Sequence, residues 1–362
     1  MAVIPFGFTN IFIKIYTNTF TLITPIYDTI GICLDPFAAR ANHSCDPNAY
    51  IVFDGSKMSF RSQKPIRKDE EIFISYIDSS NPYYRRQREL LKRYFFRCKC
   101  SKCVRKFDTI EDKLLKDPAT LPSNAFKDVS WPPGAMDAFG HHDMRDKSYC
   151  VGDSGSAAAA QLEGIQWLAC RQLEAAKQYP SPVPKDKMEG AVDTIQLGLS
   201  VCLKTHIWPE HRQPLAGIRQ HIFTTFLSFK QGLKIYFYIN PVLYPQTFHP
   251  LRVVHNWTMM NLLLYYLDPS ANLEQEAELR DVGVDFGVVI LGFLLEVMDN
   301  VSMSHGREST FAREVRRKWE EVTTDMTRGD SKQLQGIKNK IEPQWRILRK
   351  LADSPELENV LG

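Results

Sequence analysis

The chain has 362 residues, 44% of them hydrophobic and 24% charged, an ordinary balance for a globular protein of two or three domains. Its formal net charge of +3 is nearly neutral at this size, which argues against a protein that binds mainly through phosphate contacts. The eight cysteines form no regular disulfide framework, so we expect a reducing compartment.

Membrane association is not expected either. The N-terminus is apolar in places but lacks the basic lead and the small-residue cleavage site of a signal peptide. The longest apolar run, Phe286 to Leu295, lies between two acidic residues, and about ten residues are too few to cross a bilayer. We therefore predict a soluble protein without a membrane partner.

The first hundred residues are predicted to be rich in β-structure. They are dense in Ile, Phe, Tyr and Thr, which suit a half-buried pleated surface, and Asp54-Gly55 is a strong hairpin signal because both residues tolerate positive φ. In chain order we expect strands within Ile11–Leu22, Ala49–Phe53, Lys57–Arg61 and Glu70–Ile77, and then a basic helix over Tyr83–Phe95.

The rest of the chain divides into a linker and a helical domain. Residues 117–156 are rich in Pro, Gly, Asp and Ser and predict a long loop or linker. From Ala157 onward the hydrophobic period is helical, and short connections favour antiparallel neighbours. The expected helices are Ala157–Tyr179, Met188–His206, Gln213–Phe237, Leu251–Leu267, Leu273–Asn300, Ser309–Thr327 and Ser331–Ala352.

Three cysteines, Cys98, Cys100 and Cys103, lie within six residues of one another. Thiolates are soft ligands that suit tetrahedral zinc, and three of them leave one coordination position open. Cys45, in the polar run Asn42 to Asn48, is the natural fourth ligand. Two alternatives stay open at this point: three reduced surface thiols, and a zinc ribbon for nucleic acid. The ribbon usually brings its ligands as two close pairs, and we find no direct nucleic-acid motif.

Three motifs follow one another along this part of the chain. They are NHSCDPN from Asn42 to Asn48, EEIFISYID from Glu70 to Asp78, and the spacing Cys98-x-Cys100-x-x-Cys103. Together they resemble the first signature, the second signature and the post-SET zinc motif of the SET-domain protein-lysine methyltransferases. The three occur in the order and at about the distances found in that family.

Two further sets of residues, one before the first motif and one in the second half of the chain, are similar to segments of the SET-and-MYND subfamily. Asn18-Thr-Phe-Thr21 resembles the strand that precedes the first signature in that subfamily. Tyr244-Pro245, His249-Pro250 and the run HGRE from His305 resemble its helical C-terminal domain. The resemblance implies an α+β fold: a partial, β-rich SET core with a post-SET zinc cluster, followed by an all-α, repeat-like C-terminal domain. The implied boundaries are 1–97 for the partial SET domain, 98–116 for the post-SET zinc segment, 117–156 for the linker and 157–362 for the helical domain.

The resemblance also assigns roles to single residues. It implies Tyr76 as the catalytic tyrosine and Phe20 and Tyr94 as walls of the substrate-lysine channel. Its implied S-adenosylmethionine contacts are Asn18, Asn42, His43 and Phe96, and its implied ligands for a structural Zn²⁺ are Cys45, Cys98, Cys100 and Cys103.

The function implied by the resemblance is S-adenosylmethionine-dependent methylation of lysines in histones or other proteins, in the nucleus, the cytoplasm or both. The family's Gly-rich first SET strand and MYND finger are missing from the sequence, so we expect an N-terminally truncated member that is weak or inactive by itself. The alternative is a catalytically inactive SET remnant that serves as a zinc-stapled scaffold for partner proteins.

Overall fold

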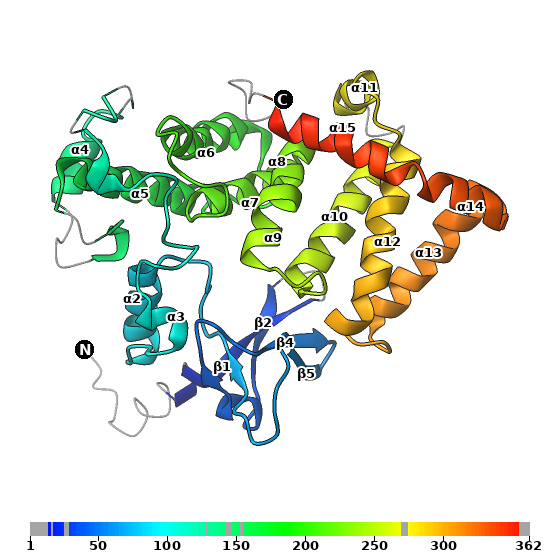
Figure 1. Cartoon of the computed structure of the whole chain (residues 1–362), viewed down its shortest axis with the longest axis horizontal. Helices are drawn as coiled ribbons and strands as arrows, with labels where there is room; N and C mark the ends of the chain where they lie inside the picture. Colours follow the sequence, from blue (N-terminus) through cyan, green and yellow to red (C-terminus); the bar gives the residue numbers. More distant parts are fainter. Residues whose placement is uncertain are drawn as a thin grey trace.

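The computed structural model describes residues 14–15, 17–24, 29–122, 124–127, 129, 131–141, 147–152, 155–268 and 274–354. Within them, the strands gather at one end of the molecule and the long helices form the larger body above them (Figure 1). This arrangement confirms the expected α+β fold, a small β-rich region followed by many helices.

The β-rich region consists of three two-stranded sheets. The first sheet pairs β1 (Thr19–Ile23) with β2 (Thr29–Leu34) and is antiparallel. The second pairs β3 (Asn42–His43) with β6 (Phe73–Ile74) and is parallel. The third pairs β4 (Ala49–Asp54) with β5 (Lys57–Ser62) and is antiparallel. The β4–β5 hairpin turns at Gly55, whose φ of +60° is the left-handed conformation that the Asp-Gly signal predicts. The predicted hairpin is therefore confirmed.

Two strand predictions in this region need correction. The strand expected within Ile11–Leu22 begins only at Thr19, because the described residues just before it are helical; residues 11–13 and 16 lie outside the described part. The strand expected over Glu70–Ile77 shrinks to Phe73–Ile74, since only this pair finds a partner, in β3. β2 was not predicted, although its Ile and Leu residues favour an extended strand.

The cysteine segment follows a predicted helix. The basic helix is α2 (Tyr83–Tyr94), and it ends where Phe95 adopts a left-handed φ of +63°. A short helix, α3 (Ser101–Val104), carries the last cysteine of the group. In residues 117–156 the described structure contains α4 (Ala135–Gly140) and two 3₁₀ turns, η2 (Pro118–Thr120) and η3 (Lys147–Tyr149).

Helices fill the chain from residue 157 onward. Their bounds are α5 (Ala157–Ala176), α6 (Met188–Leu203), α7 (Leu215–Phe226), α8 (Phe229–Lys234), a π-helical turn (Ile235–Ile239), α9 (Asn240–Leu243), α10 (Pro250–Tyr266), α11 (Glu274–Asp281), α12 (Phe286–Ser304), α13 (Thr310–Thr327), α14 (Ser331–Lys338) and α15 (Ile341–Asp353). Three predicted helices are each divided in the structure. The breaks fall at Leu227 and at Gly283, which both have positive φ, and at the turn that joins α14 to α15.

Two apolar cores hold the helical body together. One joins α5, α6 and α7, and the other is built around α10, α12, α13 and α15. Among the described residues, α12 is long and apolar enough to span a membrane by length and composition. Its side chains Leu291, Phe293 and Leu294 are fully buried against neighbouring helices, as in the core helix of a globular protein.

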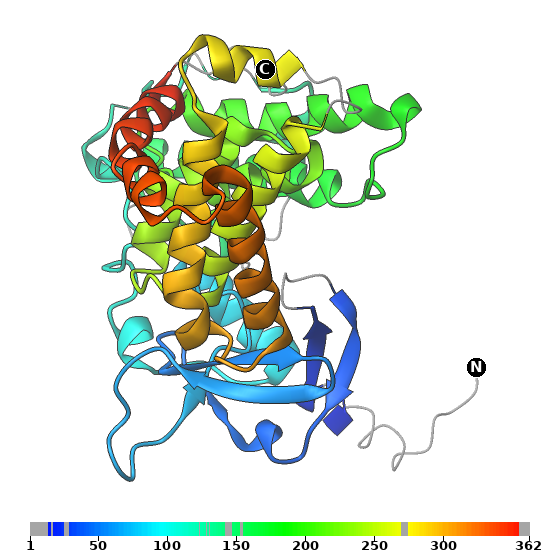
Figure 2. The same cartoon turned by 90° about the vertical axis from the view of Figure 1, so that its right-hand side faces the viewer.

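The β4–β5 hairpin joins the two regions. Figure 2 shows the lower ends of α12 and α13 meeting the strands. There Arg61 donates to the carbonyls of Ser302 and Met303 at 3.0 and 2.7 Å, and Asp54 accepts from the backbone N–H of Thr310 at 3.1 Å. The hairpin thus caps the end of one helix and the start of the next.

Candidate active site and metal centre

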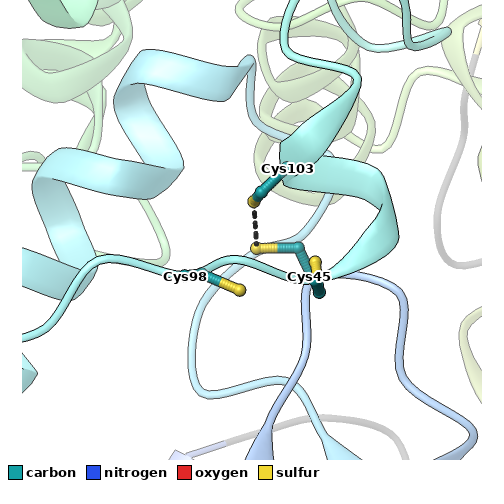
Figure 3. A group of neighbouring side chains, drawn as sticks. Cys45, Cys98 and Cys103 are labelled. Carbon is teal, nitrogen blue, oxygen red and sulfur yellow. Dashed lines mark hydrogen bonds between the residues drawn. The ribbon is translucent and has the colours of Figure 1, made fainter.

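The four cysteines named by the sequence analysis come together in the structure. Their sulfur atoms all lie within 4.8 Å of one another, and Cys103 contacts Cys45 at 3.5 Å. Figure 3 shows Cys45, Cys98 and Cys103 turned toward a common centre from separate segments. Cys98 and Cys103 are buried, at 9% and 3% exposure, and Cys100 is half-buried, so the alternative of three surface thiols is wrong.

This group has the composition and spacing that zinc requires. Zn–S bonds of about 2.3 Å in a tetrahedron place sulfur atoms about 3.8 Å apart. Hydrogen bonds within the group lower the pKa of the Cys98 thiol, mainly through Cys100, and lower that of Cys100 to about 5, mainly through Cys103. Two thiols are thus readily deprotonated, as metal ligands must be. Without a metal ion the same bonds raise the pKa of Cys45 and of Cys103, mainly through Cys100, so these two thiols hold the protons that zinc would displace. The residues therefore fit a structural zinc ion.

Helix α2 holds the cysteine segment in place. The side chain of Gln87 donates to the carbonyl of Cys98 at 2.9 Å and accepts from its N–H at 3.1 Å. Leu90, fully buried one turn later, packs against the cysteines. Because Gln87 satisfies both backbone groups of Cys98, the segment leaves the helix in one defined direction.

Tyr76 lies at the point where the two signature runs meet. Its hydroxyl donates to the carbonyl of Ala41 at 2.6 Å, and its own carbonyl accepts from the Tyr94 hydroxyl at 3.2 Å. The Tyr76 and Tyr94 rings are 5.0 Å apart. Burial is the main cause that raises the pKa of Tyr76, so its phenol stays protonated at neutral pH and is a poor base.

A cavity of about 810 Å³ opens beside Tyr76, between the β-rich region and the helices. The walls include Phe20 and Tyr94, which the sequence analysis placed in the lysine channel, and Asn18, which it placed at the cofactor. The Asn18 amide donates to the carbonyl of Lys14 at 2.7 Å. The structure thus brings Asn18 together with the predicted channel residues.

The other three predicted cofactor residues are not among the residues that line this cavity. The exposed amide of Asn42 donates to the Glu71 carboxylate at 2.7 Å. The buried ring of His43 lies 5.8 Å from the ring of Phe96. The exposed Asn42 amide keeps its oxygen and a second N–H beyond the bond to Glu71, and these groups suit the charged amino-acid end of S-adenosylmethionine.

The sequence analysis did not assign three aromatic residues that line the cavity. Tyr50, on β4, lies 5.6 Å from the His249 ring, which stacks on Tyr244 at 4.5 Å. The Tyr50 hydroxyl also donates to the carbonyl of Ser304. The Tyr244-Pro245 and His249-Pro250 pairs were the available signal, but only the tertiary structure brings them to Tyr50.

Asn48, the last residue of the first signature, was also missed. Its side chain accepts from the N–H of Phe73 at 2.8 Å and donates to the carbonyl of Glu71 at 2.8 Å. These bonds fix the second signature beside the first. Asn48 therefore aligns the segment that ends in Tyr76.

Comparison with known proteins agrees with this geometry. Residues 20–77 match the SET domain family. The chain is 45% identical over 104 residues to "SET domain and MYND-type zinc finger protein 6" of Schizosaccharomyces pombe, which covers 29% of this chain and 22% of that protein. It is 36% identical over 92 residues to human "Histone-lysine N-methyltransferase SMYD3", covering 25% and 22%, and 30% identical over 141 residues to zebrafish (Danio rerio) "N-lysine methyltransferase SMYD2-B", covering 38% and 32%.

The chain carries a SET-domain segment and is related to the SET-and-MYND proteins. The matched segments span between about a fifth and a third of the length of these relatives. The sequence-based recognition is therefore confirmed over part of the chain. The individual roles of Tyr76 and the cofactor and channel residues stay predictions.

Proposed function

We propose that the protein is an S-adenosylmethionine-dependent protein-lysine N-methyltransferase. The observation that carries the proposal is the position of Tyr76, which lies where the two SET signatures meet and lines the cavity between the β-rich and helical regions. The names of two relatives, a histone-lysine and an N-lysine methyltransferase, support the same reaction class. Histone or other protein lysines remain the proposed substrates, in the nucleus or cytoplasm.

The bound cofactor would supply a methyl group on a sulfonium centre. The chain's own task is then to align a neutral lysine amine with that methyl group. The Phe20, Tyr76 and Tyr94 rings line the route, and a narrow apolar channel lowers the pKa of an entering ammonium group by desolvating it.

The hydroxyl of Tyr76 is held by its bond to the Ala41 carbonyl. With its proton committed there, the phenol oxygen keeps its lone pairs for polarised C–H or N–H groups at the transfer site. Because the pKa of Tyr76 is raised, the phenol positions the amine and stays neutral while solvent takes the amine proton. The predicted outcome of Tyr76→Phe is therefore lost alignment in a correctly folded protein.

Methyl transfer from labelled S-adenosylmethionine to core histones and to a mixed protein panel tests the proposal. We expect Tyr76→Phe to lower kcat/KM roughly 100-fold or more, as removal of a preorganised polar group at a reacting centre does. Tyr265→Phe, at an exposed tyrosine of α10, is the matched control and should retain activity.

Cofactor binding, measured by calorimetry on the zinc-loaded chain, gives an independent result. Binding that weakens in Asn42→Ala supports the proposed cofactor site. A folded, zinc-loaded chain that neither binds S-adenosylmethionine nor transfers methyl groups would contradict the proposal and favour the alternative of a scaffold.

A further inference from the structure

The ring of His43 connects the cysteine cluster to Tyr76. Its Nε2 lies 3.2 Å from the Cys45 sulfur, and its Nδ1 lies 3.0 Å from the backbone nitrogen of Tyr76. His43 is 8% exposed, and its ring packs 5.2 Å from the Tyr76 ring and 5.8 Å from the Phe96 ring. Both ring nitrogens are therefore engaged inside the protein.

The two contacts fix where the imidazole proton lies. A backbone N–H is always a donor, so Nδ1 must accept the Tyr76 N–H and cannot carry a proton. A neutral imidazole then carries its proton on Nε2, which points at the Cys45 sulfur. Donation to a thiolate is the hydrogen bond that a buried cluster of negative sulfur atoms needs.

Local backbone structure keeps the ring in this position. His43 and Ile74 are paired in the parallel β3–β6 sheet, and the N–H of Ser44 donates to the Ile74 carbonyl at 2.9 Å. Cys45 follows His43 by two residues, in the bend just after β3, so the two side chains leave neighbouring points of the chain. Strand β6, which leads to Tyr76, is thereby held against β3, which leads to the cluster.

We propose that His43 is a positioning residue, which transmits the position of the zinc-bound Cys45 to the backbone of Tyr76 through a ring with its proton on Nε2. The part that concerns Tyr76 rests on the proposed methyl transfer. The proposal changes the sequence-based assignment, because both ring nitrogens are used within the protein. The His43 side chain then has no ring nitrogen left for a hydrogen bond to the cofactor.

The protonation pattern is measured directly by ¹⁵N NMR of the zinc-loaded 362-residue chain with labelled histidine. We expect an Nε2-protonated ring, with Nδ1 in the shift range of an unprotonated acceptor, and a Tyr76 amide shift that moves when zinc is removed. A proton on Nδ1 at neutral pH would overturn the proposal. Neither the histidine shifts nor the Tyr76 amide shift depends on methyltransferase activity.

Two substitutions separate the two contacts. In His43→Asn the side-chain oxygen replaces Nδ1 as acceptor for Tyr76, but the donor to Cys45 is lost. In His43→Gln the amide N–H replaces Nε2 as donor to Cys45, but the acceptor is lost. His255→Gln is the matched control, since His255 is another buried histidine, far from the cluster in sequence, and its Nε2 donates to the Gly232 carbonyl at 3.0 Å.

We expect opposite losses from the two substitutions. His43→Asn should weaken zinc binding by about 10- to 100-fold in competition with a chromophoric chelator, as loss of an outer hydrogen bond to a ligand does. It should also shift the sulfur-to-metal charge-transfer band of the cobalt-substituted chain. His43→Gln should retain zinc affinity and lower kcat by roughly 100-fold with little change in KM, because Tyr76 is displaced. His255→Gln should leave the zinc affinity and the cobalt spectrum unchanged.

Parallel loss of zinc affinity and kcat in both variants would show a merely structural histidine and overturn the proposal. A rise in the KM for S-adenosylmethionine at unchanged kcat would overturn it in favour of direct cofactor contact. If the wild-type chain transfers no methyl groups, the proposed function fails, while the NMR, zinc and cobalt measurements still decide the link between Cys45 and Tyr76.

Discussion

The two regions of the molecule are stabilised in different ways. The helical region buries large apolar side chains in two continuous cores, one of them built around α12. In the β-rich region the compact buried group around Tyr76 consists largely of cysteines, and β2 turns Ile30, Ile32 and Leu34 toward solvent. A small region with little apolar burial needs another source of stability, and the four-cysteine cluster supplies a site for it. We infer from this comparison that a zinc ion bound by the four cysteines orders the region around Tyr76, whereas apolar packing orders the helices.

Zinc removal should produce the largest effect. A structural zinc ion contributes on the order of 10 kcal/mol to folding, so chelation or Cys100→Ser should unfold the region around residues 42–104 and leave the helices folded. Hydrogen exchange should show lost protection at Tyr76 and retained protection in α12. Cys33→Ser is the matched control, because Cys33 lies on β2 outside the cluster. Complete unfolding of the helices on chelation would contradict the comparison.

A cavity in the helical core should destabilise the helices and leave the zinc site intact, the opposite of zinc removal. Phe293 is fully buried between the rings of Tyr236 and Trp345, at 5.3 and 5.0 Å. Phe293→Ala should lower the free energy of unfolding by about 3–5 kcal/mol in chemical denaturation. Zinc content, measured by atomic absorption, should stay the same as in wild type. Phe37→Ala, at a 75% exposed position, should change stability by less than about 0.5 kcal/mol.

The difference between the regions also explains what could be predicted from the sequence. The hairpin at Gly55 and the long helices follow from local signals, namely an Asp-Gly pair and helical periodicity. The break at Leu227 was missed because a leucine with positive φ has no local signature. β2 was missed because its register depends on β1.

The candidate site shows the same division. The four cysteines could be grouped from their chemistry and from the resemblance, and the structure brings them together. The wall made by Tyr50 and His249 could not be predicted, because it joins residues that are distant in sequence. The connection through His43 also required coordinates, since the motif alone does not say which ring nitrogen faces which partner.

Acid should weaken the helical region through a buried histidine. Burial lowers the pKa of His255 to about 4, below its ordinary value of 6.5. As the pH falls, the unfolded chain therefore binds this proton before the folded chain does. The stability that comes from the neutral ring is complete above pH 6.5 and is lost as the pH falls toward about 4. The free energy of unfolding decreases by about 3 kcal/mol over this range.

His255→Gln should flatten this pH dependence, measured as the free energy of unfolding of α10 and α12 by hydrogen exchange. Hydrogen exchange of residues 42–104, measured in the same samples, distinguishes this effect from the release of zinc by acid. A pH profile of the helices that is identical in the variant and the wild type would rule out His255 as its source.

The smallest effect should come from the contact that joins the two regions. Arg61 caps the end of α12 through the carbonyls of Ser302 and Met303, and Gly306, with a φ of +100°, makes the turn that follows. Arg61→Gln should cost about 1 kcal/mol, the usual net value of such hydrogen bonds. The lost bonds connect the two regions. The variant should therefore increase the difference in free energy between the zinc-dependent unfolding of the β-rich region and the zinc-independent unfolding of the helices. Arg317→Gln, on the exposed face of α13, removes a similar charge without spanning the regions and should leave that difference unchanged. Equal differences in both variants would mean that the hairpin contacts the helices without coupling their stability to the cluster.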